Sequence, residues 1–220
     1  MAEAGYKANF EKFSLFSSLI YASLNNISYT MSFPNKTGSF LSVPTFASSR
    51  NLSAEIEAIY SPVKNLDFRL TTTVQDSKFT DYGVIAPETA RDDLAGKPYI
   101  WTNNRAERIP NYMAELSMAY TYKIFDLFVS YRQIGKRWTS PSNVYHLNGY
   151  NEISAGLDIR ILKNLGLRVW GDNLGNSRGL TEGNIRGDQF LANGNFEKGS
   201  LQIGRIILPR SFWSSLTFSF

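Results

Sequence analysis

Apolar and polar residues alternate along most of this chain, which is the period of a β-strand with one apolar and one polar face. The last ten residues show it most clearly. Their even positions are apolar except for Ser214, and their odd positions are serine or threonine except for Trp213. The same alternation recurs in residues 2–9, 14–25, 52–61, 66–75, 112–121, 126–132, 152–161 and 165–172. Phe16 and Ile20 blur it in the second of these stretches. The pattern predicts about nine antiparallel strands.

The predicted connections alternate in length. Short turns lie near Glu11, Lys64, Ile124 and Lys163, whereas the other connections cover residues 31–46, 80–110, 136–145 and 177–208. Short turns at one end and long loops at the other are typical of up-and-down transmembrane β-barrels. A soluble β-sandwich also alternates, but it rarely has a long loop at every second connection.

The polar face of the predicted strands carries charges, and we expect these to face the inside of a barrel. They are Glu55, Glu57, Arg69, Glu115, Arg132, Asp158 and Arg160. The alternative is a soluble antiparallel sheet with one solvated face. Aromatic residues near the short turns favour the barrel, because aromatic girdles mark membrane interfaces. They are Phe10, Phe13, Tyr60, Phe68, Tyr120, Tyr122 and Phe125. The fold class is therefore all-β, a portion of an antiparallel transmembrane barrel.

The odd number of predicted strands indicates that the chain is only part of a barrel, because bacterial single-chain barrels have even numbers of strands. Residues 1–5 show no export signal, which fits a chain with further strands before it. We expect residues 1–220 to be the C-terminal portion of a larger barrel. Phe220, at the end of the last alternating stretch, is then the expected signal for barrel assembly.

Composition and candidate chemistry exclude several classes of protein. Hydrophobic residues make up 43% and charged residues 19%, which excludes extended disorder. The net charge of +4 is scattered, so no nucleic-acid surface is expected. There is no cysteine, and the only histidine, His146, has no acid or second ligand at a telling spacing. We therefore expect no catalytic residue, no metal site, no cofactor and no enzyme activity.

Two segments near the C-terminus carry the most specific motifs of the chain. Residues 165–184 run from an apolar strand into Asn-Leu-Gly-Asn and Arg-Gly-Leu-Thr-Glu-Gly, which resembles the next-to-last strand and following loop of the TonB-dependent outer-membrane receptor family. Residues 204–220 enter the last strand through Pro-Arg and close on phenylalanine in the same way. The resemblance implies a 22-stranded barrel with an N-terminal plug domain and a TonB box. Neither plug nor box is visible in this sequence.

The resemblance also implies a function. Such receptors take up a scarce nutrient, such as an iron chelate (a siderophore), cobalamin or a glycan, across the outer membrane of a Gram-negative bacterium. The implied partners are outer-membrane lipid, the TonB–ExbB–ExbD complex and the barrel assembly machinery. The alternative is an independent small barrel, a porin or an adhesin.

The small-molecule ligand is not identified by any motif. Loops on a rigid scaffold carry recognition, and residues 80–110 and 177–208 are the two longest connections. Tyr99, Trp101 and Arg105 are bulky groups on the first of them. We expect these three residues to contact the ligand.

Overall fold

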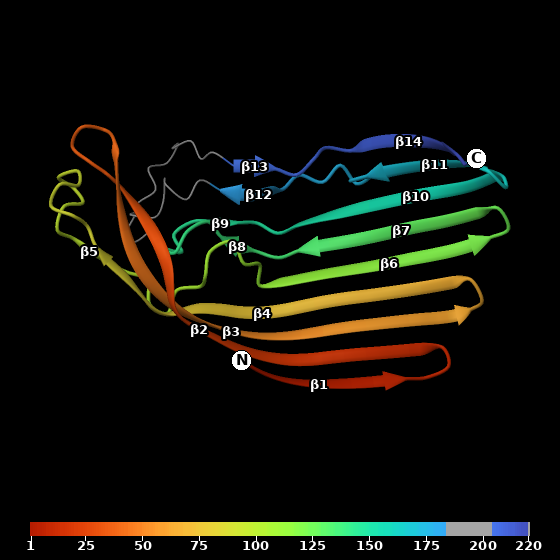
Figure 1. Ribbon diagram of the computed structural model, residues 1–220, viewed down its shortest axis with the longest axis horizontal. Helices are drawn as coiled ribbons and strands as arrows, with labels where there is room; N and C mark the ends of the chain where they lie inside the picture. The colour runs from red at the N-terminus through yellow and green to blue at the C-terminus, as the bar shows by residue number, and fades with distance from the viewer. Residues whose placement is uncertain (184–203, 220) are drawn as a thin grey trace.

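A computed structural model describes residues 1–183 and 204–219 and contains one large antiparallel sheet (Figure 1). Nine strands pair in the order β1-β2-β3-β4-β6-β7-β10-β11-β14, and β5 pairs with β4 beyond them. The nine are β1 (Ala2–Asn9), β2 (Phe13–Pro34), β3 (Phe40–Val63), β4 (Leu66–Ile85), β6 (Tyr112–Tyr122), β7 (Phe125–Ile134), β10 (Tyr150–Leu162), β11 (Leu165–Asp172) and β14 (Ser211–Phe218). Each strand pairs with the next in this order, so the prediction of about nine meandering antiparallel strands is confirmed. Phe220 lies outside the described residues.

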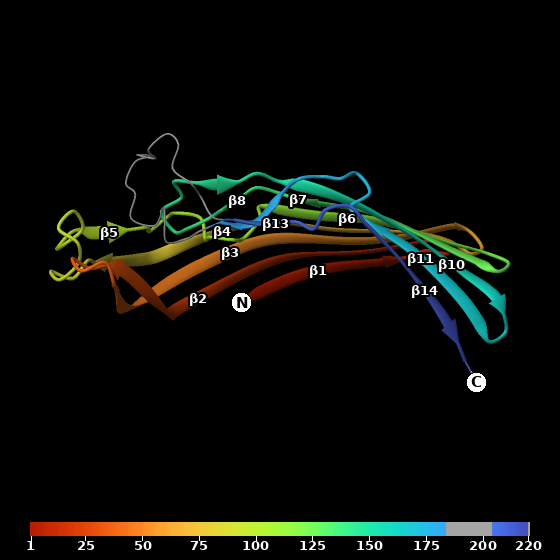
Figure 2. The ribbon, with the colours of Figure 1, turned by 90° about the horizontal axis from the view of Figure 1, so that it is seen from above.

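The sheet has the shape of a piece of barrel wall. The short turns lie together at one end and the long connections at the other, as Figure 1 shows. Seen from above, the sheet is bent along its width, and β14 turns away from the plane of the central strands (Figure 2). None of the described residues forms a helix of the length and apolarity that crossing a membrane requires.

The strand register sorts the side chains into two faces, because residues directly opposite each other in a sheet share a face. Leu157 lies between Leu127 of β7 and Val169 of β11 on what we call the apolar face. This face holds exposed large side chains, with Leu116 48% and Leu216 67% exposed. A soluble sheet would bury such residues against a second layer. The apolar face therefore has the character of a surface that contacts lipid.

The strands β2, β3 and β4 extend further than the alternation predicted. The expected loop at residues 31–46 is wrong, because β2 continues to Pro34, β3 begins at Phe40 and only a tight turn separates them. A bulge between Leu24 and Ile27 shifts the alternation of β2, which hides the strand from a period-two reading. Pro44 is tolerated because the pairing of β3 with β4 ends at Ala47, which leaves a free edge where no N–H is needed.

The remaining long connections also contain short strands. Three two-strand pairs form there: β5 (Pro98–Ile100) with β4, β8 (Arg137–Trp138) with β9 (His146–Leu147), and β12 (Leu180–Gly183) with β13 (Gly204–Ile206). The buried hydrophobic cluster of the chain lies at this end. It contains Met31, Phe33, Ala47, Phe79, Tyr82, Ala86, Ala90, Leu94, Trp101 and Ala106. Thus the long-loop end is a folded layer, which we call the rim.

Candidate functional site

The polar face of the sheet carries an ion pair where the sequence predicted a charge network. Glu57 of β3 and Arg69 of β4 lie 2.8 Å apart, oxygen to nitrogen. Glu55 shares this face, opposite Ser18 and Thr73. No ion pair involves Glu55 in the part of the chain that the structure describes. The predicted network is therefore confirmed for Glu57 and Arg69 but not for Glu55.

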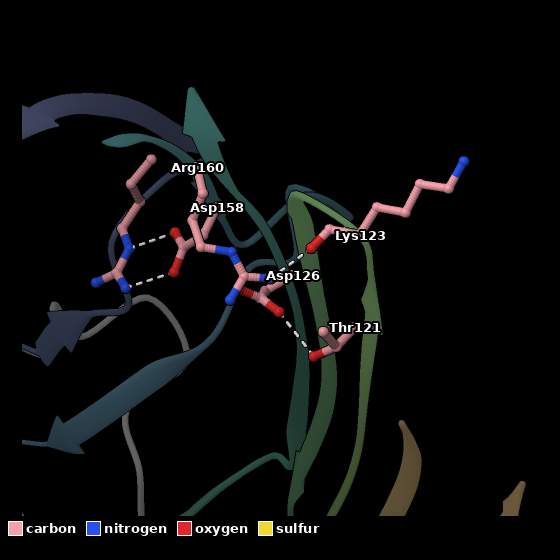
Figure 3. Close-up of polar contacts among 6 residues, drawn as sticks. Thr121, Lys123, Asp126, Asp158 and Arg160 are labelled. Carbon is pink, nitrogen blue, oxygen red and sulfur yellow. Dashed lines mark hydrogen bonds and ion pairs between the residues drawn. The ribbon is translucent and has the colours of Figure 1, made fainter. Parts of the chain in front are cut away.

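A second group of charges crosses β7, β10 and β11 on the same face (Figure 3). Arg168 donates two hydrogen bonds of 2.6 Å to the two carboxylate oxygens of Asp158. Arg160 lies 3.6 Å from Asp126, which also accepts a hydrogen bond of 2.7 Å from the Thr121 hydroxyl. Paired charges of this kind suit a wet or filled barrel interior and would be costly in lipid. The polar face is thus the inner face expected from the sequence.

An aromatic stack lies across the polar face toward the rim. The ring of Trp170 lies 5.3 Å from that of Phe128 and 6.0 Å from that of Trp213, centroid to centroid. Gly156 of β10 makes room for it, since a Cβ there would lie 2.0 Å from the indole ring. Both indole N–H groups donate to the carboxylate of Asp172, at 2.7 and 3.4 Å. The stack is therefore fixed by its packing on Gly156 and by the hydrogen bonds to Asp172.

The rim has its own hydrophobic core, built by the ends of β2, β3 and β4 and by the connection from β4 to β6. Tyr82 is at its centre, with ring centroids 4.7 Å from Phe79, 5.0 Å from Trp101 and 5.4 Å from Tyr29. Its hydroxyl donates to the sulfur of Met31 at 3.1 Å. Burial raises the pKa of the Tyr82 hydroxyl, so it stays protonated and keeps this hydrogen bond. The connection from β4 to β6 is therefore anchored by the packing of Trp101 in this core as well as by the pairing of β5 with β4.

Hydrogen bonds join neighbouring connections of the rim. The Asn143 side chain accepts from the backbone N–H of Arg105 at 2.7 Å and donates to its carbonyl at 2.8 Å. The Arg137 guanidinium, whose residue is only 5% exposed, donates to the backbone carbonyls of Leu180 and Thr181. These contacts link the β4–β6, β7–β10 and β11–β14 connections into one layer.

The β12–β13 hairpin covers part of the polar face. A cavity of about 520 Å³ separates it from the sheet, with Glu152 and Asp172 on the sheet side and Thr181 and Ile207 on the hairpin side. A second, open cavity of about 570 Å³ lies at the rim. Its walls are residues 145–149, 176–180, 206, 207 and 209. These volumes are in the range of small-molecule sites.

His146 lines the second cavity, and its ring packs edge-on against Trp138, 5.5 Å between centroids. Within residues 1–183 and 204–219, no three His, Asp or Glu side chains gather where they could share a metal ion.

The arrangement of the sheet is that of known uptake receptors. The ferric yersiniabactin uptake receptor FyuA from Yersinia pestis matches with a TM-score of 0.72 and 14% identity over 99% of this chain. The siderophore receptor PiuA from Acinetobacter baumannii matches with a TM-score of 0.69 and 16% identity over 98% of this chain. The chain has the fold of part of these receptor barrels. The outer membrane transporter YddB from Escherichia coli has the same arrangement, with a TM-score of 0.66 and 10% identity over 99% of this chain.

These matches define how much of a receptor barrel is present. The chain spans 29% of FyuA, 28% of PiuA and 32% of YddB, so it covers about a third or less of each. No protein-family model and no curated protein matches its sequence. The identities are low enough that the likeness shows the fold alone.

The three residues predicted to contact a ligand do not lie together in the structure. Trp101 is 4% exposed in the rim core, and the Tyr99 ring stacks on it at 6.2 Å. Arg105 forms a β-bridge with Lys78 of β4, so the two side chains lie on the same side of the sheet. Phe79, the next residue on β4, points into the rim core on the opposite side. Arg105 therefore lies outside that core, 3.0 Å from Asp76. The structure thus brings Tyr99 and Trp101 together and separates Arg105 from them. Their contact with a ligand stays a prediction.

Sequence reasoning missed Arg137 and Asn143, the residues that join the connections of the rim. Asn143 has a positive φ of 54°, a conformation that asparagine tolerates better than most residues. An asparagine after Ser-Pro-Ser could have suggested a turn. Nothing in the sequence shows that Arg137 points to carbonyls from a distant segment.

Glu107 in the rim provides a test of this packing by pH. One carboxylate oxygen is buried with no hydrogen bond among the described residues, and burial raises the pKa of this group. The rim is therefore most stable below the ordinary pKa of glutamate, and it loses this stability as pH rises through the raised pKa of the folded state. We expect Glu107→Gln to slow exchange of the Ala106 amide, which donates to the Ser77 carbonyl, at neutral pH.

The measurement is hydrogen exchange of the purified barrel at several pH values, corrected for the intrinsic rate. Amides of β6 that pair within the sheet are the internal control, because Glu107 should not affect them. Identical pH profiles for Ala106 in the parent and in Glu107→Gln would show that the carboxyl has no part in rim stability.

Proposed function

We propose that this chain is part of the barrel wall of an outer-membrane receptor that takes up a scarce nutrient, with an iron chelate as the first candidate. The observation that carries the proposal is the two-faced meander, which follows FyuA and PiuA over nearly the whole chain. FyuA is a ferric yersiniabactin uptake receptor, and PiuA is a siderophore receptor. Cobalamin and glycans remain candidate substrates of the same class of receptor.

The two faces support a place in the outer membrane of a Gram-negative bacterium. Exposed apolar residues on one face suit lipid, while paired charges on the other suit a barrel interior. In this proposal the barrel assembly machinery inserts the protein, and the TonB–ExbB–ExbD complex supplies energy to the whole receptor. The rim would supply ligand contacts, with the half-buried Tyr99 at its surface and Trp101 packed behind it.

A porin or an adhesin is disfavoured because the matched proteins are receptors and transporters. The same matches support a protein that is not an enzyme. A porin would admit small solutes without energy, whereas a receptor of this class concentrates one ligand.

The test is an uptake assay in a strain that lacks the gene encoding this chain. We expect uptake of one radiolabelled ligand from a panel of ferric chelates, cobalamin and oligosaccharides to fall to background, and the gene to restore it. A protonophore should abolish the restored uptake, because TonB uses the proton gradient. Unchanged uptake of every ligand, or restored uptake that ignores the protonophore, would contradict the proposal.

A further inference from the structure

Three basic side chains lie next to one another on the side of the sheet that carries the apolar face. Arg50 of β3 is directly opposite Lys78 of β4, and Lys78 forms a bridge with Arg105 of the following connection. Residues opposite each other in neighbouring strands share a face, so the three side chains form one row. We call Arg50, Lys78 and Arg105 the basic row.

The basic row follows immediately after the apolar residues. On β3 the apolar face runs from Tyr60, near the short turn, to Leu52, and Arg50 is the next residue on that face. Residues 52–60 span roughly 27 Å of extended strand. At a strand tilt of about 40° this covers about 20 Å of an apolar band about 25 Å tall, and the long side chains of the row reach the remaining distance to its edge. The row therefore lies at the height where hydrocarbon gives way to lipid headgroups on the rim side.

The charges of the row are incompletely neutralised. Asp76 lies 3.1 Å from the Lys78 ammonium and 3.0 Å from the Arg105 guanidinium. Arg50 makes no ion pair within residues 1–183 and 204–219. The three basic residues and Asp76 together carry a formal charge of +2. Asp81 does not belong to the row, because it lies opposite Ser48, in the next row toward the rim. Arg105 is 44% exposed, so it can contact an outside anion.

We propose that the basic row binds a phosphate group on the headgroup of a lipid in the outer leaflet. The inference rests on the proposed membrane placement and names the partner of one site on the barrel exterior. Guanidinium groups bind phosphate oxygens through paired N–H donors, and each basic residue near an anionic membrane surface adds affinity. Acyl chains of the same lipid would lie along Leu52 and the apolar residues between it and the short turn.

The choice of a lipid over a free phosphate follows from the position of the row. The row is on the side opposite to Phe79 and the rim core, away from the polar face that a transported solute would meet. Its approach from outside runs over exposed apolar side chains, with Leu52 51% and Val74 54% exposed. A ligand with both phosphate and hydrocarbon satisfies both surfaces.

The experiment compares binding of a fluorescent, doubly phosphorylated lipid A to the purified receptor that contains this chain, in neutral detergent micelles. We expect Arg50→Gln with Arg105→Gln to weaken binding roughly tenfold or more, since each basic residue contributes about 1 kcal/mol near anionic lipid. Lys12→Gln with Lys64→Gln is the matched control, because it removes two exposed cations from the β1–β2 and β3–β4 turns at the opposite end of the sheet. This control should bind within about twofold of the parent.

Three results would overturn the inference: equal weakening in the matched control, equal binding of dephosphorylated lipid A, or displacement of the lipid by inorganic phosphate at low millimolar concentration. Arg50→Lys with Arg105→Lys keeps the charge and should keep most of the binding, which separates charge loss from misfolding. Insertion into neutral lipid vesicles of the receptor that contains this chain is measured alongside. Insertion without lipid A binding contradicts the basic row alone, whereas failure of that receptor to insert contradicts the proposed function.

Discussion

Replacing Leu157 with arginine should destabilise the membrane-inserted barrel by roughly 2–4 kcal/mol. Leu157 lies in an apolar row between Leu127 and Val169, midway along β10, so its side chain faces the lipid near the middle of the band. An arginine there must lose its hydration or pull water and headgroups inward. Urea unfolding in lipid vesicles, followed by tryptophan fluorescence, measures the change.

Ser130→Arg is the matched control for this substitution. Ser130 lies on the polar face, where it lines the cavity of about 520 Å³ together with Glu115 and Glu152. An arginine there meets carboxylates in a wet space, so its effect on stability should be much smaller than that of Leu157→Arg. If both substitutions were tolerated equally, the assignment of the apolar face to lipid would be wrong.

Replacing Gly156 with alanine should destabilise the barrel by about 1–3 kcal/mol, the usual range for overpacking. The added Cβ would lie 2.0 Å from the ring of Trp170, so the indole must move. Movement would separate Trp170 from Phe128 and weaken its hydrogen bond of 2.7 Å to Asp172. Urea unfolding and the near-ultraviolet circular dichroism of the stacked indoles report the two effects.

Gly166 provides the control, because it also lies on the polar face and a Cβ there would meet only the Ile159 carbonyl, at 3.8 Å. Gly166→Ala should therefore be nearly neutral. In a Trp170→Ala background, Gly156→Ala should also lose most of its cost, since the clashing ring is gone. A cost for Gly156→Ala that persists without the ring would show that backbone conformation, and not the stack, requires glycine.

The wall of the barrel could be predicted from the sequence because one face contacts an apolar solvent and the other a polar one. A strand such as 152–161 then shows regular alternation, and the register confirmed its faces. Even Phe16 and Ile20, which blur the pattern, keep their places on the polar side opposite Glu57 and Ser53. Local alternation was sufficient to predict the two faces of the wall because each face has a single environment, apolar on one side and polar on the other.

The rim could not be predicted in the same way. Its residues are sorted by contacts between segments far apart in the chain, such as Met31 with Tyr82 and Asn143 with Arg105. Aromatic residues on a predicted loop suggested ligand contacts, but Trp101 is buried against Tyr82. Sequence patterns identify which side chains are bulky, whereas the tertiary fold decides which of them stay exposed.

The shared core of the rim limits which segments can be grafted between this protein and another barrel. The connection from β4 to β6 cannot be exchanged alone, because Trp101 and Ala106 complete a core whose other half is Phe33 and Ala47. A graft that transplants only residues 86–111 would expose the remaining half or fill it with mismatched side chains. The unit of exchange for this core is residues 27–47 together with residues 79–106, moved as one cassette, and Asn143, which pairs with Arg105, must accompany them.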